Sequence, residues 1–125
     1  MEKYIKEASK QTPAIEFDFK QGILSIKGRS TPENAVSFYK ELLDALEVYT
    51  NTPAILTNVT IELEYFDTPS SAAILGIFKK LENIQKNGNV VIVNWNYEDE
   101  DMLDSGQDYQ KVIKIPFKMV SVVEE

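Results

Sequence analysis

The sequence contains no cysteine and no histidine, and these two absences remove much of the common catalytic chemistry. Without cysteine the chain has no disulfide framework, no thiol nucleophile and no thiolate metal ligand. Without histidine it lacks the usual general base near neutral pH, the commonest zinc ligand and every Ser-His arrangement. Chemistry by this chain alone would therefore depend on carboxylates, lysines, hydroxyls or tyrosines.

Glycine, arginine and positive charge are also scarce. The five glycines follow no Walker or dinucleotide-binding spacing, so we expect neither ATP nor another cofactor to bind here. Arg29 is the single arginine, which leaves little capacity for bidentate phosphate clamps. The 13 basic and 20 acidic residues give a net charge of −7, and this balance argues against a nucleic-acid partner.

Long hydrophobic runs are absent as well. No apolar stretch approaches the ~20 residues of a membrane-spanning helix. The N-terminus, Met1-Glu2-Lys3-Tyr4-Ile5, lacks the apolar core of a signal peptide. We therefore expect a cytoplasmic protein without membrane insertion, folded as one domain over residues 1–125.

Hydrophobic periodicity predicts an α/β domain with a mixed sheet of about five strands, two main amphipathic helices and a short acidic third helix. The predicted strands cover residues 14–20, 23–28, 57–65, 90–93 and 112–120. The predicted helices cover residues 35–49, 69–87 and 97–110. Ser30-Thr31-Pro32-Glu33 is interpreted as the cap of the first helix. The continuous apolar run 90–93 is typical of an interior strand covered on both faces.

The junction between the 57–65 strand and the second helix carries the main candidate site. Thr68 precedes Pro69, which suits the first helical position, so we expect Thr68 to be the N-cap and to bond the N–H of Ser70 or Ser71. A well-made cap is the simpler interpretation. The functional one is that the Thr68 hydroxyl stands beside free backbone donors and the positive helix end, where a phosphate is favoured.

Three other groups have a functional and a structural interpretation. The acidic run Glu98 to Asp101 offers oxygen ligands for a divalent cation but lacks the EF-hand spacing, and a solvated face is the simpler reading. Glu62 and Glu64 share one face of a strand and could pair as acid and base, or simply form its wet face. Trp95 and Tyr97 are either interface anchors or packing residues.

The whole order of elements resembles the SiaC family of bacterial regulatory phosphoproteins, which have a STAS-like fold. The segment Leu63-Glu64-Tyr65-Phe66-Asp67-Thr68-Pro69-Ser70-Ser71 resembles the family signature around its phosphoacceptor threonine. Further similarity lies in Thr12-Pro13-Ala14-Ile15, the segment 28–35, Phe38-Tyr39 and the segment 98–102. The resemblance therefore implies that Thr68 is the phosphorylated residue.

The same resemblance implies a set of protein partners and no enzymatic activity. A serine/threonine kinase of the histidine-kinase-like ATPase class would phosphorylate Thr68, and a metal-dependent PP2C-type phosphatase would remove the phosphate. The unphosphorylated form would bind and stimulate a diguanylate cyclase, which raises cyclic di-GMP and favours aggregation or biofilm. Related STAS proteins instead antagonise anti-sigma factors, and this output is the alternative. A small carboxylate enzyme or ligand-binding module is a third possibility.

The charge around Thr68 suggests how such a switch would work. A phosphate adds about −1.5 to −2 charges beside Asp67 and Glu64, so a partner docked there would be expelled. The helix N-terminus offsets only ~0.3–1 kcal/mol at an exposed site, so the fold need not open. We expect the partner surface to include Glu64, Asp67, Pro69, Ser70 and Ser71. The sequence leaves open whether Ser70 or Ser71 also accepts phosphate.

Overall fold

The structure is a computed structural model that describes residues 3–122. Six strands and three helices follow one another along the chain. Their bounds are β1 Lys3–Lys6, β2 Ala14–Asp18, β3 Ile23–Ser30, α1 Ala35–Tyr49, β4 Leu56–Phe66, α2 Thr68–Lys86, β5 Val90–Tyr97, α3 Glu100–Val112 and β6 Phe117–Ser121. The α/β class, the mixed sheet and the three helices are confirmed, and β1 is a sixth strand that hydrophobic periodicity did not reveal.

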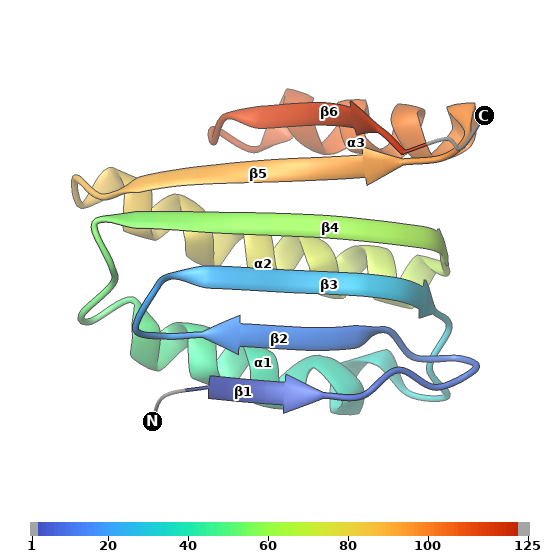
Figure 1. The fold of residues 1–125 in the computed structure, drawn as a ribbon, viewed down its shortest axis with the longest axis horizontal. Helices are drawn as coiled ribbons and strands as arrows, with labels where there is room; N and C mark the ends of the chain where they lie inside the picture. The colour runs from blue at the N-terminus through green and yellow to red at the C-terminus, as the bar shows by residue number, and fades with distance from the viewer. Residues whose placement is uncertain (1–2, 123–125) are drawn as a thin grey trace.

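The strands lie in one sheet in their sequence order, β1-β2-β3-β4-β5-β6. β1, β2 and β3 pair antiparallel, and β3, β4, β5 and β6 pair parallel. Helices α1, α2 and α3 supply the parallel crossovers, as connections between parallel strands require. All three helices lie behind the sheet in Figure 1, so one face of the sheet is covered and the other is open.

The hydrophobic core fills the space between the covered sheet face and the helices. The predicted apolar stripe of α2 is confirmed, because Ile74, Ile77, Phe78, Leu81 and Ile84 are all fully buried. Along the strands, buried side chains alternate with outward-facing ones, as expected for a sheet with one buried face. The core residues of the sheet are Ile15, Phe17, Leu24, Ile26, Val59, Ile61, Leu63, Val91, Val93 and Trp95.

β5 was predicted to be covered on both faces, and this prediction is wrong. β5 is an interior parallel strand, but only Val91, Val93 and Trp95 are buried, whereas Val90 is 49% exposed. The apolar run arises because the outward positions Val90 and Ile92 are aliphatic although no helix covers them.

The predicted cap of α1 is also wrong. Asn34 is the N-cap, and its side-chain oxygen accepts a hydrogen bond from the Ser37 N–H. Ser30 instead ends β3, where its side chain is fully buried. The two segments Ser30-Thr31-Pro32 and Asp67-Thr68-Pro69 look alike in sequence, but they occupy different structural positions.

Candidate functional site

The candidate site lies where β4 ends and α2 begins, and Asp67 is the residue that caps the helix. Asp67 has extended backbone angles of φ −86° and ψ 175°, and its carboxylate accepts the Ser70 N–H at 2.9 Å. Thr68 is the first helical residue and Pro69 the second, so the prediction of Thr68 as the N-cap is wrong. An aspartate cap both bonds the orphan donor and places negative charge at the positive helix end.

Ser70 points inward and its hydroxyl is fully used. The Ser70 Oγ donates to the Ser30 carbonyl at 3.1 Å and accepts from the Ser30 Oγ at 2.8 Å. Because the Ser30 proton goes to Ser70, the Tyr39 hydroxyl must donate to the Ser30 Oγ, 2.6 Å away. All three side chains are fully buried, and they form a directed chain from α1 through β3 to α2.

Ser71 is held by the third helix. The Tyr109 hydroxyl of α3 donates to the Ser71 carbonyl at 2.9 Å, so the Ser71 hydroxyl is the donor in its 3.0 Å bond to the Tyr109 oxygen. Ser71 is half-buried in this arrangement. The first turn of α2 is therefore tied to α1 and β3 on one side and to α3 on the other.

Thr68 is the one hydroxyl of the three that faces solvent. Its side chain and that of Pro69 are exposed, and the Thr68 hydroxyl makes no hydrogen bond within residues 3–122. Glu64 is exposed on the strand that leads to it, and Asp67 is half-buried beside it. The start of α2 thus presents a free hydroxyl on an acidic, firmly anchored helix end.

Burial sets the ionisation of the two tyrosines at this site. Burial raises the pKa of Tyr39 to about 12, and the negative charge of Asp67 adds to the rise. Burial likewise raises the pKa of Tyr109, against the hydrogen bond with Ser71. Both phenols are therefore neutral at physiological pH and serve as hydrogen-bond donors rather than as proton-transfer groups.

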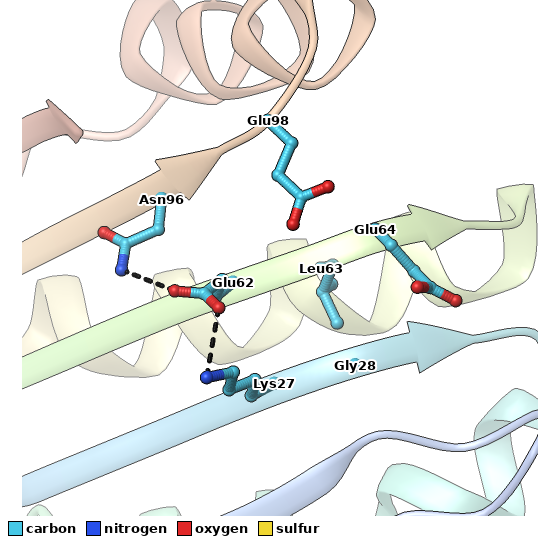
Figure 2. A pocket seen from close by; sticks show the side chains of 7 residues that line it. All are labelled: Lys27, Gly28, Glu62, Leu63, Glu64, Asn96 and Glu98. Atoms are coloured by element: carbon cyan, nitrogen blue, oxygen red, sulfur yellow. Dashed lines mark hydrogen bonds and ion pairs between the residues drawn. The ribbon is translucent and has the colours of Figure 1, made fainter. Parts of the chain in front are cut away.

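A second group of polar side chains lies on the open face of the sheet (Figure 2). Glu62 on β4 contacts the Lys27 ammonium at 3.2 Å and accepts a hydrogen bond from the Asn96 amide at 3.0 Å. Glu64 and Glu98 border the same shallow notch. The Asn96 hydrogen bond, followed by the Lys27 contacts, lowers the pKa of Glu62 against partial burial.

This notch gives little support to acid-base catalysis by Glu62 and Glu64. A carboxyl group that acts as a general acid near neutral pH needs a raised pKa, whereas the pKa of Glu62 is lowered. The two glutamates do project from the same sheet face, as their spacing predicted. Their geometry is that of a polar surface rather than of an enclosed site.

The acidic run Glu98 to Asp101 mainly begins α3. Asp99 is the N-cap, and its carboxylate accepts the Met102 N–H at 2.8 Å, while Glu100 and Asp101 are exposed in the first turn. Within residues 3–122, no group of three or more acidic side chains is placed to hold a metal ion. The solvated-face interpretation therefore accounts for this run.

Packing explains Trp95 and Tyr97. Trp95 is fully buried, and its indole N–H donates to the Met102 carbonyl at 2.9 Å. Tyr97 is half-buried and packs against the core.

Among the helices of the described chain, none is long and apolar enough to cross a bilayer.

Sequence reasoning singled out Thr68 as a candidate but missed the residues that hold its surroundings in place. Ser30 was assigned to a cap, Tyr39 to a helical apolar stripe and Tyr109 to the few apolar positions of the acidic helix. A tyrosine in a fully buried stripe is itself a signal, because its hydroxyl needs a partner inside the protein. That signal points to a polar contact without naming the partner.

Comparisons with known proteins agree with this architecture. A family model described as "SiaC family regulatory phosphoprotein" matches residues 6–122. An uncharacterised protein of Pseudomonas aeruginosa strain UCBPP-PA14 is 27% identical over 111 residues, which cover 87% of this chain and 88% of that protein. The crystal structure of apo-SiaC from Pseudomonas aeruginosa is 25% identical with a TM-score of 0.89, covering 96% of this chain and 99% of that one.

A further solved structure contains a partner. It is the diguanylate cyclase SiaD in complex with its activator SiaC from Pseudomonas aeruginosa. The matched chain is 25% identical to this one with a TM-score of 0.89, covering 94% of this chain and 98% of that chain.

Proposed function

This chain belongs to the SiaC family of regulatory phosphoproteins, and we propose that it is a non-enzymatic switch whose phosphorylated residue is Thr68. In its unphosphorylated form it binds and activates a diguanylate cyclase, and phosphate on Thr68 ends that interaction. The cyclase product, cyclic di-GMP, then controls aggregation or biofilm formation. Because the kinase and the cyclase act on nucleotides of the cytoplasm, we propose that the protein is cytoplasmic.

The observation that carries the proposal is the different environment of three neighbouring hydroxyls. Ser70 is buried and bonded to Ser30, Ser71 is bonded to Tyr109, and Thr68 alone is exposed without a partner in the described chain. A kinase can approach Thr68 without opening the helix. To reach Ser70 it would have to break the buried hydroxyl chain.

The proposed partners supply the chemistry that this chain lacks. The sequence holds no phosphate-binding glycine loop, so the phosphoryl group comes from a separate serine/threonine kinase of the histidine-kinase-like ATPase class. A PP2C-type phosphatase reverses the reaction. The cyclase partner is supported by the complex of the SiaC relative with its cyclase.

The effect of the phosphate is a change of surface rather than of fold. About −1.5 to −2 charges are added within an acidic surface that includes Glu64 and Asp67. The Asp67 cap, the Ser30 contact and the Tyr109 contact all hold the first turn of α2 independently of the Thr68 hydroxyl. The modified protein therefore stays folded while a partner that contacts this end meets extra charge and bulk.

The contact surface that we propose consists of Glu64, Asp67, Pro69 and Ser71 around Thr68. Ser70 lies behind this surface, since its side chain is fully buried. Its contribution to partner binding is then indirect, through the position of the helix start.

The test begins with the site of modification. The protein is incubated with ATP and a lysate of its own source, and intact mass and peptide mapping follow, with and without phosphatase. We expect one phosphate on Thr68, no phosphate on Thr68→Ala and normal modification of the matched control Ser71→Ala. A phosphate on another residue, or none in a lysate shown to be active on other substrates, would contradict the assignment.

The second step measures binding and output. Purified unmodified protein, phosphorylated protein and Thr68→Ala are compared for binding to a diguanylate cyclase from the same source and for stimulation of cyclic di-GMP synthesis. We expect Thr68→Ala to remain active and the phosphorylated form to lose binding. Equal affinity of the cyclase for both forms would refute control of binding by the phosphate. Capture of an ATPase-domain sigma regulator instead of a cyclase would favour the anti-sigma antagonist alternative.

A further inference from the structure

The open face of the sheet has a chemical pattern that runs straight across the strands. Strand register places its outward residues in rows, each formed by direct Cα partners. One row crosses all six strands and reads Ile5, Glu16, Ser25, Thr60, Asn94, Lys118. The row nearer the start of β4 reads Lys3, Asp18, Ile23, Asn58, Ile92, and the row nearer its end reads Ala14, Lys27, Glu62, Asn96, Val120.

Aliphatic side chains remain uncovered at one end of this face. Leu56 and Val90 are direct partners at the start of β4 and β5, and they are 44% and 49% exposed. Ile23 on β3 is 46% exposed one row further along. Thr68 lies beyond the opposite end of β4, which spans eleven residues and hence roughly 35 Å. This apolar end is therefore remote from the proposed phosphorylation site.

The open faces of two copies place oppositely charged and apolar residues opposite one another when a two-fold axis parallel to β4 relates the copies. A two-fold axis along β4 brings β3 of one copy over β5 of a second copy, and β2 over β6, because the sheet order is sequential. Glu16 then faces Lys118 of the second copy, and by symmetry the contact occurs twice. In the same superposition Ile23 faces Ile92, and Leu56 meets Leu56 on the axis.

The remaining positions include neutral contacts and contacts between like charges. Lys27 comes over Asn96 of the second copy. Glu62 approaches its own symmetry mate, but in each copy the Lys27 ammonium lies 3.2 Å from the Glu62 carboxylate and balances its charge (Figure 2). Lys3 balances Glu16 and Asp18 within one copy, at 3.5 and 4.0 Å. Glu64 projects from the same face of β4 and also approaches its own symmetry mate, so the face of each copy carries Lys3, Lys27 and Lys118 against the carboxylates of Glu16, Asp18, Glu62 and Glu64, in a chain whose net charge is −7.

The size of the face also fits a contact between two copies. Strands are spaced about 4.8 Å apart and rise about 3.3 Å per residue, so the six-stranded face measures roughly 600 Å² as a flat area. A standard interface removes about 800 Å² of accessible surface from each partner, which corrugated side chains over such an area approach. The contact would be reversible, since its central row is polar.

From this pattern we propose that the open sheet face is a self-association surface, on which a second copy of this chain packs face to face about an axis along β4. Two copies related in this way have parallel β4 strands. Both Thr68 residues then lie at the same end of the pair, so a dimer presents two copies of the α2 helix start to partners. The proposal does not depend on whether Thr68 is phosphorylated.

Charge exchange provides the test. The molar mass of the purified full chain is followed by sedimentation velocity over a wide concentration range, and we expect it to rise from 14.2 kDa towards twice that value. Glu16→Lys and Lys118→Glu should each weaken self-association at least tenfold, because each places like charges opposite one another. The double variant should recover most of the wild-type dimerisation constant.

Two controls separate this geometry from a general charge effect. Glu41→Lys makes the same charge change on the helix side and should leave self-association unaltered. Leu56→Asp puts two carboxylates on the axis and should abolish the dimer, whereas Val36→Asp at an 80% exposed site of α1 should not. Circular dichroism confirms that each variant is folded. A chain that stays monomeric at every concentration, or a double variant no better than the singles, would overturn the proposal and leave the face to a different partner.

Discussion

Gly106 offers a sharp test of how α3 is seated. A Cβ built at this position would lie 2.5 Å from Trp95 Cδ1 and 2.6 Å from Trp95 Nε1. Real Cβ atoms do not approach so closely, so either the ring or the helix must move. Trp95 is fully buried, and its indole N–H is bonded to the Met102 carbonyl in the turn before Gly106. The ring therefore has little freedom to yield.

Gly106→Ala has two effects that lower the free energy of unfolding and one that raises it. Overpacking in a filled core costs about 1–3 kcal/mol. A strained or broken indole hydrogen bond adds about 1–3 kcal/mol, because the buried N–H is left without a partner. Alanine recovers about 1 kcal/mol through its better helix propensity. We expect the free energy of unfolding to fall by about 1–5 kcal/mol.

A second helical glycine supplies the matched control. The nearest atom to a Cβ at Gly76 in α2 is the Leu43 Cδ2 at 3.8 Å, which is an ordinary contact. Gly76→Ala should therefore raise the free energy of unfolding by about 0.5–1 kcal/mol. The same substitution thus has opposite signs in two helices of one protein.

Urea unfolding followed by fluorescence and far-ultraviolet circular dichroism measures both variants. Trp95 is the only tryptophan, so a change in its fluorescence emission reports directly on the packing of α3 against it. The tie between Tyr109 and Ser71 should loosen together with α3 in Gly106→Ala. If Gly106→Ala proved as stable as Gly76→Ala with unchanged emission, the close packing of α3 on Trp95 would be refuted.

Three more predictions concern the start of α2. Asp67→Ala should lower the free energy of unfolding by about 1 kcal/mol through loss of the cap, and Asp67→Asn should retain most of it, as thermal unfolding would show. Ser70→Ala, which leaves the buried Ser30 hydroxyl without its acceptor, should cost about 1–2 kcal/mol, and a neutral result in the same assay would count against the hydroxyl chain. The folded-state pKa of Tyr39, about 12, lies above its ordinary value of 10.0, so its contribution to stability is complete below pH 10 and is lost as pH rises towards 12. Tyr39→Phe should remove about 1.4 kcal/mol per pH unit of that alkaline slope in urea titrations, relative to wild type.

Much of the fold follows from local pattern because one face of each main element is buried. The alternation in β2, β3 and β4 and the helical spacing in α1 and α2 reflect a single core layer, and these five elements were predicted. β1 was missed because Lys3–Lys6 is short and both Tyr4 and Ile5 are apolar, so the pattern lacks a polar face. β5 was recognised as a strand, but it was wrongly expected to be covered on both faces because its outward residues are also aliphatic.

The sequence predicted a candidate site at the junction of β4 and α2, but not the contacts that hold this junction together. Asp67 and Thr68 are both good N-cap residues, and only the backbone angles decide which of them starts the helix. The partners of Ser70 and Ser71 come from Ser30, which is 40 residues away, and from Tyr109, which is 38 residues away. Contacts of such separation leave no local periodicity in the sequence. They appear only when the sheet order brings α1, α2 and α3 together.

The two outermost strands have a consequence for the behaviour of the protein at high concentration. A long, exposed strand edge is a template on which further chains can add and grow into fibres. Here β1 has four residues and carries Lys3 and Lys6, whereas β6 has five and follows Pro116, which cannot donate to a ladder. Both edges are therefore short, and the lysines of β1 and Pro116 at the start of β6 disfavour growth by strand addition. Addition of further chains at the edges of the sheet is thus disfavoured even where the protein is concentrated.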